Sequence, residues 1–443
     1  MTGKRKIFMF VLLLCTLVIG MASQRPVEAK KKVKALTDQK IWNKKRIQAT
    51  RAEVKYSFYL SKDKKKAWII KIKPLKRKMK TIKIPPKLKG GEVVCISHDF
   101  TTDYEPGECI TSVFGGEAEP WYYGKTAQCR YSKSITKMTL PDCVEYIGSG
   151  AFGGMTNLKS VRLPAMLKEI ESYAFYGSDK LTKVVMNKKL KNFSRESFAF
   201  CKKLTDISLD KSNKALTVKD GMLFDKSMKK LIWAAPGIKE IMIPEGTCSI
   251  GRDCFSTSCV NKLSIPSSLA RVENNGLYVP YLKDLSLDAN NNTFEIDGES
   301  FFIKNTGELI CQLPRNGKAA YVSSKVKKIT GNSKCSGDYS AEDGSTIQYL
   351  VFLGDVILCK GSNKIITEQH YGYIQLVFLT QKLPLIDKKP KYRDNLLIDK
   401  ADYIYVPRGS EKNYFNALKK FYTFKSDVVR IKPVTKRVMG EIS

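Results

Sequence analysis

Histidine is nearly absent from this chain of 443 residues, which contains only His98 and His370. Because imidazole most often moves protons near neutral pH and commonly binds metals, this scarcity argues against histidine-based catalysis and His-rich metal sites. Acidic residues are also in the minority, with 43 Asp and Glu against 77 Lys and Arg and a formal charge of +34. The surplus favours anionic partners such as nucleic acid, acidic polysaccharide or a membrane surface.

Long apolar runs are missing beyond the N-terminus. Residues 7–20 form an apolar run of 14 residues behind Lys4, Arg5 and Lys6, shorter than the roughly 20 residues that span a bilayer. Small residues that suit cleavage follow at 20–22 and at 27–29, and the break in composition after Ala29 favours the second site. Residues 1–29 are therefore predicted to be a signal peptide, with a retained anchor as the alternative. The mature chain is expected to be secreted without a transmembrane segment.

The cysteines do not form a complete disulfide framework. Removal of Cys15 with the signal leaves eleven of the 12 cysteines, and an odd number cannot pair fully within one chain. Cys143, Cys201 and Cys254 occupy positions of the repeat described below where a small buried thiol is expected. Cys95, Cys109 and Cys129 lie in a turn-rich region that leaves room for one disulfide.

A repeat with a period of 23 residues is the most informative feature. The segments that begin at Ile135, Leu158, Leu181 and Leu204 share the pattern L-x-x-L-x-L, and an apolar residue and then a phenylalanine follow at constant spacing in the first three. Strict alternation in the first part predicts a strand with one buried face. Neither part of the repeat can bury its apolar side alone, so successive coils are predicted to stack into a solenoid with a continuous core.

Two longer insertions interrupt this period. Residues 220–236 match residues 297–314, and each segment reads as a β-hairpin with its turn at 226–229 or 304–307. Similar strands at 204–210 and 282–288 precede them, so strand, loop and hairpin form a duplicated block of about 78 residues.

The motif Leu158-x-x-Val161-x-Leu163-Pro164, with Ile170 and Ala174-Phe175 after it, resembles the BspA-like leucine-rich repeat family of secreted and surface proteins. The resemblance implies a leucine-rich repeat solenoid of the mostly β, α/β horseshoe class. A parallel sheet would line the concave face, with short turns or helical turns on the convex side and two inserted β-hairpins. It also implies adhesion or partner binding and no common catalytic centre. The resemblance covers about residues 50–425 and departs from the family pattern at 97–134 and 330–400.

The domain organisation follows from these patterns. After the signal peptide at 1–29, a basic flexible arm is predicted at 30–50 and an N-terminal capping region with a first degenerate coil at 51–134. The leucine-rich repeat solenoid with its two hairpins is assigned to 135–330, degenerate C-terminal repeats and a cap to 331–425, and a basic tail to 426–443.

The outward strand positions are predicted to form a ladder on the concave side, which is the usual binding face of a solenoid. Its candidate binding residues are Lys137, Thr139, Ser160, Arg162, Lys183, Asp206, Ser208, Glu240, Lys262, Ser264, Asp284 and Ser286. The alternative is that these are simply soluble strand residues. The ladder is basic at its N-terminal end and mixed or acidic beyond Asp206, so a partner would have to be complementary along its length.

No catalytic or cofactor site is predicted. Cys95, His98 and Cys109 lack the fourth ligand of a structural zinc site, and no spacing brings a Cys and His nucleophile pair together. We expect a non-catalytic, secreted or cell-surface module that binds a protein or glycan. Its basic segments favour an anionic cell-wall polymer as a further partner, whereas nucleic acid is disfavoured because no recognition element is present. A self-assembling structural surface component is the alternative.

Overall fold

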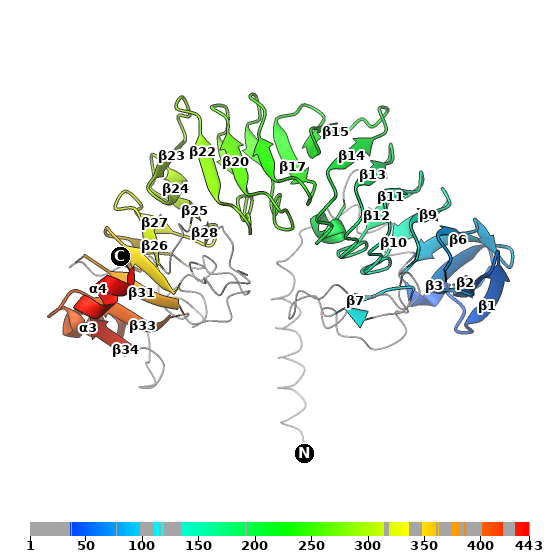
Figure 1. Ribbon diagram of the computed structural model, residues 1–443, viewed down its shortest axis with the longest axis horizontal. Helices are drawn as coiled ribbons and strands as arrows, with labels where there is room; N and C mark the ends of the chain where they lie inside the picture. The colour runs from blue at the N-terminus through cyan, green and yellow to red at the C-terminus, as the bar shows by residue number, and fades with distance from the viewer. Residues whose placement is uncertain are drawn as a thin grey trace, which may run out of the picture.

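The structure is a computed structural model that describes residues 36, 38–76, 78–97, 110–114, 117–118, 134–190, 193–313, 319–335, 348–359, 362, 374–380, 385–386, 401–419 and 430–442. Within these residues the chain is a β-solenoid whose coils follow one another along an open arc (Figure 1). β1 (Ile47–Arg51) lies at one end of the arc, and α3 (Glu411–Lys419) and α4 (Lys436–Ile442) lie at the other. The predicted signal peptide falls outside the described residues.

One ladder of parallel strands contains the L-x-x-L-x-L segments. It is divided into three sheets, each built from parallel pairs. The first contains β4 (Thr81–Lys83), β9 (Lys137–Thr139), β11 (Ser160–Arg162), β13 (Lys183–Met186) and β14 (Asp206–Leu209). The second contains β18 (Glu240–Met242), β20 (Lys262–Ile265) and β22 (Asp284–Leu287). The third contains β26 (Ala319–Val322), β29 (Tyr349–Phe352), β31 (Ile374–Phe378), β33 (Ala401–Val406) and β34 (Arg430–Pro433).

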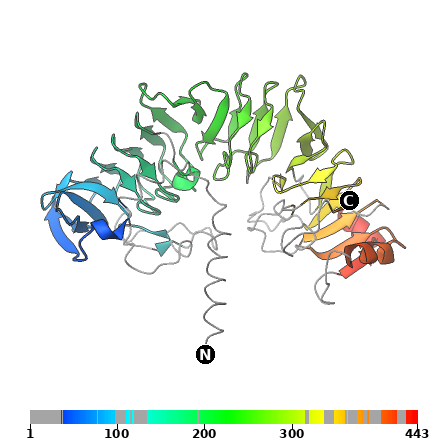
Figure 2. The same cartoon turned by 180° about the vertical axis from the view of Figure 1, so that it is seen from behind.

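A second ladder is made by the returning segment of each coil. Its short parallel strands include β6 (Gly91–Ile96), β10 (Tyr146–Ile147), β12 (Glu169–Ile170), β19 (Ser249–Ile250), β21 (Arg271–Val272), β27 (Lys328–Ile329), β28 (Lys334–Cys335), β30 (Ile357–Leu358) and β32 (Leu385–Ile386). Most coils therefore contribute one strand to either side of the core, whereas the coil after β13 returns through the 3-10 helix η2 (Arg195–Phe198). Figure 2 shows the same stacking from behind.

Stacked phenylalanines fill the core between the ladders. Phe152, Phe175 and Phe198 are each 0% exposed, and consecutive ring centroids are 5.2 Å apart. Trp233 continues the column at 5.9 Å from Phe198. Equivalent positions of a repeat meet in register when coils stack, so one aromatic per coil produces a continuous stack. The prediction of stacked parallel coils around these phenylalanines is confirmed.

Antiparallel ladders interrupt the solenoid at two places 78 residues apart. β15 (Leu216–Lys219), β16 (Met222–Asp225) and β17 (Lys230–Ala234) form the first, and β23 (Phe294–Asp297), β24 (Ser300–Ile303) and β25 (Leu309–Gln312) form the second. Each ladder has an irregularity at the matching step, Leu223/Phe224 and Phe301/Phe302. Gly221, at φ +70°, leads into β16, and a Cβ there would lie 2.7 Å from the Thr205 carbonyl oxygen. Only glycine fits this close approach.

The N-terminal unit begins earlier than the sequence suggested. Residues 38–50, expected within a flexible arm, include η1 (Gln39–Ile41) and β1, which pairs antiparallel with β2 (Val54–Leu60). β2 pairs in turn with β3 (Lys66–Pro74), and β5 (Lys87–Leu88) pairs with β6. An apolar contact holds this segment on the sheet, because Trp42 is only 5% exposed and packs on Trp68 with ring centroids 5.7 Å apart. A small hairpin of β7 (Ile110–Thr111) and β8 (Glu117–Ala118) follows.

The C-terminus also differs from the predicted basic tail. β34 adds a parallel strand beside β33, and α4 covers the outward face of the last sheet. Val438 and Ile442 of α4 pack against Tyr349 and Val351, and the Tyr321 hydroxyl donates to the Ile442 carbonyl oxygen. Val438 and Ile442 are four residues apart and so lie on the same face of this short helix, which is buried despite the basic residues beside it.

Candidate functional site

The predicted ladder begins on the strands β9, β11, β13 and β14. Their register places Lys137 opposite Ser160, Ser160 opposite Lys183, and Lys183 opposite Asp206. All four side chains are exposed, as are those of Thr139 and Arg162, while Ser208 is half-buried. The alternation explains this result, because Val161 and Val184 point into the core from the same strands.

The ladder continues on β18, β20 and β22. Glu240, Lys262 and Asp284 are opposite one another in one row, and Met242, Ser264 and Ser286 form the next. The Ser286 hydroxyl donates to the Ser264 oxygen over 2.9 Å. Met242, an outward position of the same alternation, is 77% exposed, the largest value among the exposed large apolar side chains of the described residues.

Charges along the ladder are largely paired with one another. Lys183 Nζ lies 2.7 Å from Asp206 Oδ2, and Lys262 Nζ lies 3.8 Å from Asp284 Oδ2. Arg162 Nη2 lies 2.8 Å from Asp142 Oδ1, and this hydrogen bond lowers the pKa of the Asp142 carboxyl. These pairs are about half exposed, so each contributes only about 0–1 kcal/mol to stability. Their effect is to present a polar surface with little net charge.

The positive charge of the protein is instead concentrated near one end of the arc. Residues 38–97 contain 19 Lys and Arg but only four Asp and Glu, a difference of +15. Residues 193–313, which include the second half of the ladder, contain 15 of each sign and are neutral. The strong positive net charge is therefore a property of the N-terminal unit and not of the middle of the ladder.

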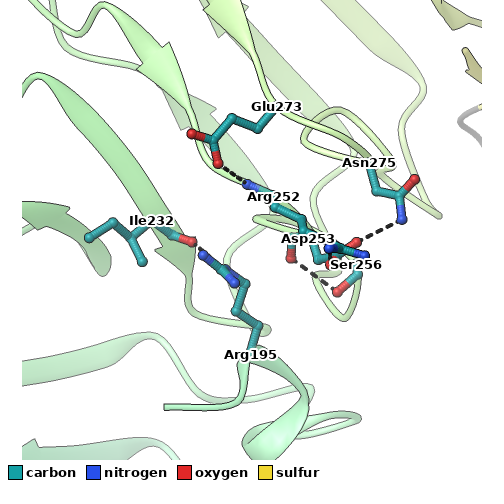
Figure 3. A network of polar contacts seen from close by, with 7 residues as sticks. All are labelled: Arg195, Ile232, Arg252, Asp253, Ser256, Glu273 and Asn275. Atoms are coloured by element: carbon teal, nitrogen blue, oxygen red, sulfur yellow. Dashed lines mark hydrogen bonds and ion pairs between the residues drawn. The ribbon is translucent and has the colours of Figure 1, made fainter. Parts of the chain in front are cut away.

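A polar network ties the coils together around the first antiparallel ladder (Figure 3). Arg195 Nε donates to the Ile232 carbonyl oxygen over 2.9 Å, and Asn275 Nδ2 donates to Asp253 Oδ1 over 2.8 Å. The Arg252 amide donates to Glu273 over 3.2 Å. Burial, together with nearby Asp253, raises the pKa of the Glu196 carboxyl. These hydrogen bonds join neighbouring coils, which is a structural use of polar residues.

Buried asparagines are the residues that sequence reasoning missed. Asn291 is 1% exposed, and its side-chain amide donates to the carbonyl oxygens of Pro266 and Leu269, each over 3.0 Å. Its oxygen accepts the amides of Thr293 and Phe294 over 2.9 and 2.8 Å. Asn213 makes equivalent bonds 78 residues earlier. The spacing Asp-x-x-Asn, present at both 210–213 and 288–291, was the available signal.

The thiols considered for chemistry are mostly buried. Cys95, Cys201 and Cys254 are free and at most 1% exposed, and burial raises the pKa of each thiol. A raised pKa disfavours the reactive thiolate. Cys143, expected to be buried, is only half-buried because it lies in the turn before β10. Cys95 is not in a disulfide, and its suggested partners Cys109 and Cys129 lie outside the described residues, as does His98.

No group of three or more His, Cys, Asp and Glu side chains is placed to hold a metal ion in the described part of the chain. Among the same residues, no helix is both long and apolar enough to cross a membrane.

Comparisons with known proteins identify the repeat. The model of the BspA type leucine rich repeat region, with six copies, matches residues 126–235 and 226–337. No curated protein matches the chain. Solved structures with similarity include a leucine-rich repeat protein of Eubacterium ventriosum, with 14% identity, a TM-score of 0.34, and coverage of 88% of this chain and 96% of that one. A leucine rich cell surface protein of Faecalibacterium prausnitzii has 14% identity, a TM-score of 0.31, and coverage of 90% and 97%.

The leucine rich repeat protein of T. pallidum has 16% identity and a TM-score of 0.28, with coverage of 55% of this chain and 89% of that one. The family match covers the coils that carry β9 to β28, where the 23-residue pattern and the phenylalanine stack are found. Residues 126–337 of this chain therefore match the BspA type leucine rich repeat region.

Proposed function

We propose that this protein is a non-catalytic binding module that is secreted or displayed at a cell surface and binds a protein or glycan through its ladder. The match of residues 126–337 to the BspA type leucine rich repeat region supports this role. The observation that carries the proposal is the ladder itself, in which outward side chains of parallel strands are in register across β9 to β14 and again across β18 to β22. Rigid, equivalent positions of this kind make an extended surface for one partner.

Met242 is the proposed centre of this surface. An exposed, flexible apolar side chain beside Ser264 and the paired charges of Lys262 and Asp284 gives an apolar anchor with a polar surround. Binding energy at interfaces concentrates in a few such anchors, and Met adapts its shape to different partners. The N-terminal basic residues would in addition attract an anionic cell-wall polymer.

The test compares two double variants of the secreted chain. Met242→Glu with Ser264→Glu alters the ladder, whereas Ala215→Glu with Asn305→Glu adds the same number of acidic residues at exposed positions off the ladder. Binding to intact cells and to a glycan array is measured by fluorescence. We expect at least a tenfold loss of binding for the ladder variant and little change for the control. Equal binding by both variants would exclude the ladder, and concentration-dependent polymers of the native protein would instead favour a self-assembling component.

A further inference from the structure

Three basic turns meet at one corner of the N-terminal unit. They are residues 43–46 before β1, residues 61–65 between β2 and β3, and residues 89–90 between β5 and β6. Backbone bonds join them, because the Lys62 amide donates to the Ile41 carbonyl oxygen and the Glu92 amide donates to the Lys65 carbonyl oxygen, each over 2.8 Å. The Asn43 side-chain amide also donates to the Ser61 carbonyl oxygen over 3.0 Å.

Close packing makes this arrangement rigid. Gly91 approaches the turn between β2 and β3 so tightly that a Cβ would lie 2.6 Å from Leu60 Cδ2 and 3.0 Å from the Lys66 carbonyl carbon. Lys66 and Glu92 are partners in the parallel pairing of β3 and β6. The turns therefore project from the same end of neighbouring strands and hold a fixed relation to each other.

Apart from Arg46 and Asp63, the exposed side chains of these turns are lysines. We define the basic tip as the exposed residues Lys44, Lys45, Lys62, Lys64, Lys65 and Lys89. None of these lysines takes part in an ion pair with any described residue. In the middle of the ladder, by contrast, Lys183 and Lys262 each have an acidic partner.

Two lysines of the basic tip occupy backbone conformations that favour other residues. Lys64 has φ +59° and Lys89 has φ +48°, in the left-handed region where Gly and Asn are usual. The acidic residue of the first turn, Asp63, is engaged in the turn itself, since its carboxylate accepts the Ser61 hydroxyl and the Lys65 amide. The hydrogen bond from the Ser61 hydroxyl is the main reason that the pKa of the Asp63 carboxyl is lowered. Asp63 keeps its negative charge, and Lys65 and Lys66 also lower its pKa. The lysines nevertheless outnumber this one carboxylate, so the turns keep a net positive charge that attracts an external anion.

We propose that the basic tip is a binding site for a linear polymer with repeating phosphodiester groups, of the polyol phosphate kind found in cell walls. The site rests on the proposed surface role, for which it supplies the attachment. Lysine ammonium groups bind phosphates as point charges without a need for base stacking, and no aromatic residue lies within the three turns to stack on a nucleobase. The neutral ladder, at a distance along the arc, would remain available to a different partner.

The test uses synthetic poly(glycerol phosphate) and the full secreted chain. One variant changes Lys62, Lys64, Lys65 and Lys89 to Gln, and the control changes the exposed Lys188, Lys202, Lys203 and Lys214 to Gln. Both lose the same net charge. Loss of four phosphate contacts reduces the slope of log affinity against log salt concentration by roughly 3. Between 50 and 200 mM salt, the affinity of the native protein should therefore fall about 50-fold more than that of the tip variant. At 50 mM salt the tip variant should bind at least tenfold more weakly than the control.

Additional measurements distinguish the ways in which this proposal could fail. A Lys→Arg version of the tip variant should restore binding, since it keeps the charge, and failure of that rescue would overturn the proposal. Equal losses in the tip variant and the control would mean that total charge, not the tip, is responsible. Equal competition by single-stranded DNA would overturn the choice of a polyol phosphate. The ladder variant Met242→Glu with Ser264→Glu should keep full binding of poly(glycerol phosphate), so failure of the ladder proposal is seen separately.

Discussion

Replacement of Phe175 by Ala tests whether the stacked rings hold neighbouring coils together. Phe175 is fully buried, and its ring lies 5.2 Å from both Phe152 and Phe198, nearly parallel to the latter at 8°. Loss of a buried phenylalanine costs about 3–5 kcal/mol, of which each aromatic pair accounts for roughly 0.5–1.5 kcal/mol. Because coils interact mainly with their neighbours, this loss should concentrate in residues 146–209.

Hydrogen exchange measured by mass spectrometry reports this change locally, and urea denaturation followed by circular dichroism reports the total. We expect faster exchange in β10, β11, β12 and β13 and little change in β29 to β34. Phe200→Ala is the control, because Phe200 is 36% exposed and its ring packs at a tilt against Tyr176, with centroids 5.1 Å apart. If Phe175→Ala were no more destabilising than Phe200→Ala, the stack would not stabilise the solenoid and the reasoning would fail.

Three further predictions follow from buried and paired groups. Asn291→Ala should lower the free energy of unfolding by about 2–4 kcal/mol, because it removes the partner of two carbonyl oxygens and two backbone amides. Exposed Asn290→Ala should cost under about 0.5 kcal/mol. Urea denaturation measures both. Exposed Cys248 should react with iodoacetamide at pH 8 far faster than Cys254, whose thiol pKa is raised by burial, and mass spectrometry would contradict this if both were modified equally. The pKa of Asp142 is lowered in the folded state. Its stabilisation is therefore present above the unfolded pKa of about 3.9 and is lost as pH falls through the folded value. Asp142→Asn should flatten the acid side of a plot of stability against pH, and an unchanged plot would refute the pairing with Arg162.

Periodicity carried most of the fold prediction. The spacing of Val161, Leu163, Ile170 and Phe175 was sufficient for stacked parallel coils, because each apolar position has one partner in the next coil and a slip of one residue would expose it. The outward ladder followed from the same alternation. Cysteine placement was less predictable, as half-buried Cys143 shows, because a turn position looks apolar in sequence but faces the edge of the coil.

The ends of the chain could not be read in the same way. Residues 38–50 look like a charged arm, yet Trp42 covers Trp68 and draws the segment onto the sheet. α4 looks like a basic tail, yet Val438 and Ile442 find a sheet face with Tyr349 and Val351. Such contacts involve residues far apart in the chain, and short segments have too little periodicity to reveal them.

By itself, the sequence determined the repeat, the direction of each side chain on the repeated strands and the surplus of positive charge, because all three depend only on local spacing and composition. Only the tertiary structure decided which groups meet. It paired the ladder charges across strands, placed Met242 beside Ser264, and gathered Lys62, Lys64, Lys65 and Lys89 from two turns at one corner. Packing between coils and turns, rather than any local preference, places these groups within reach of one another.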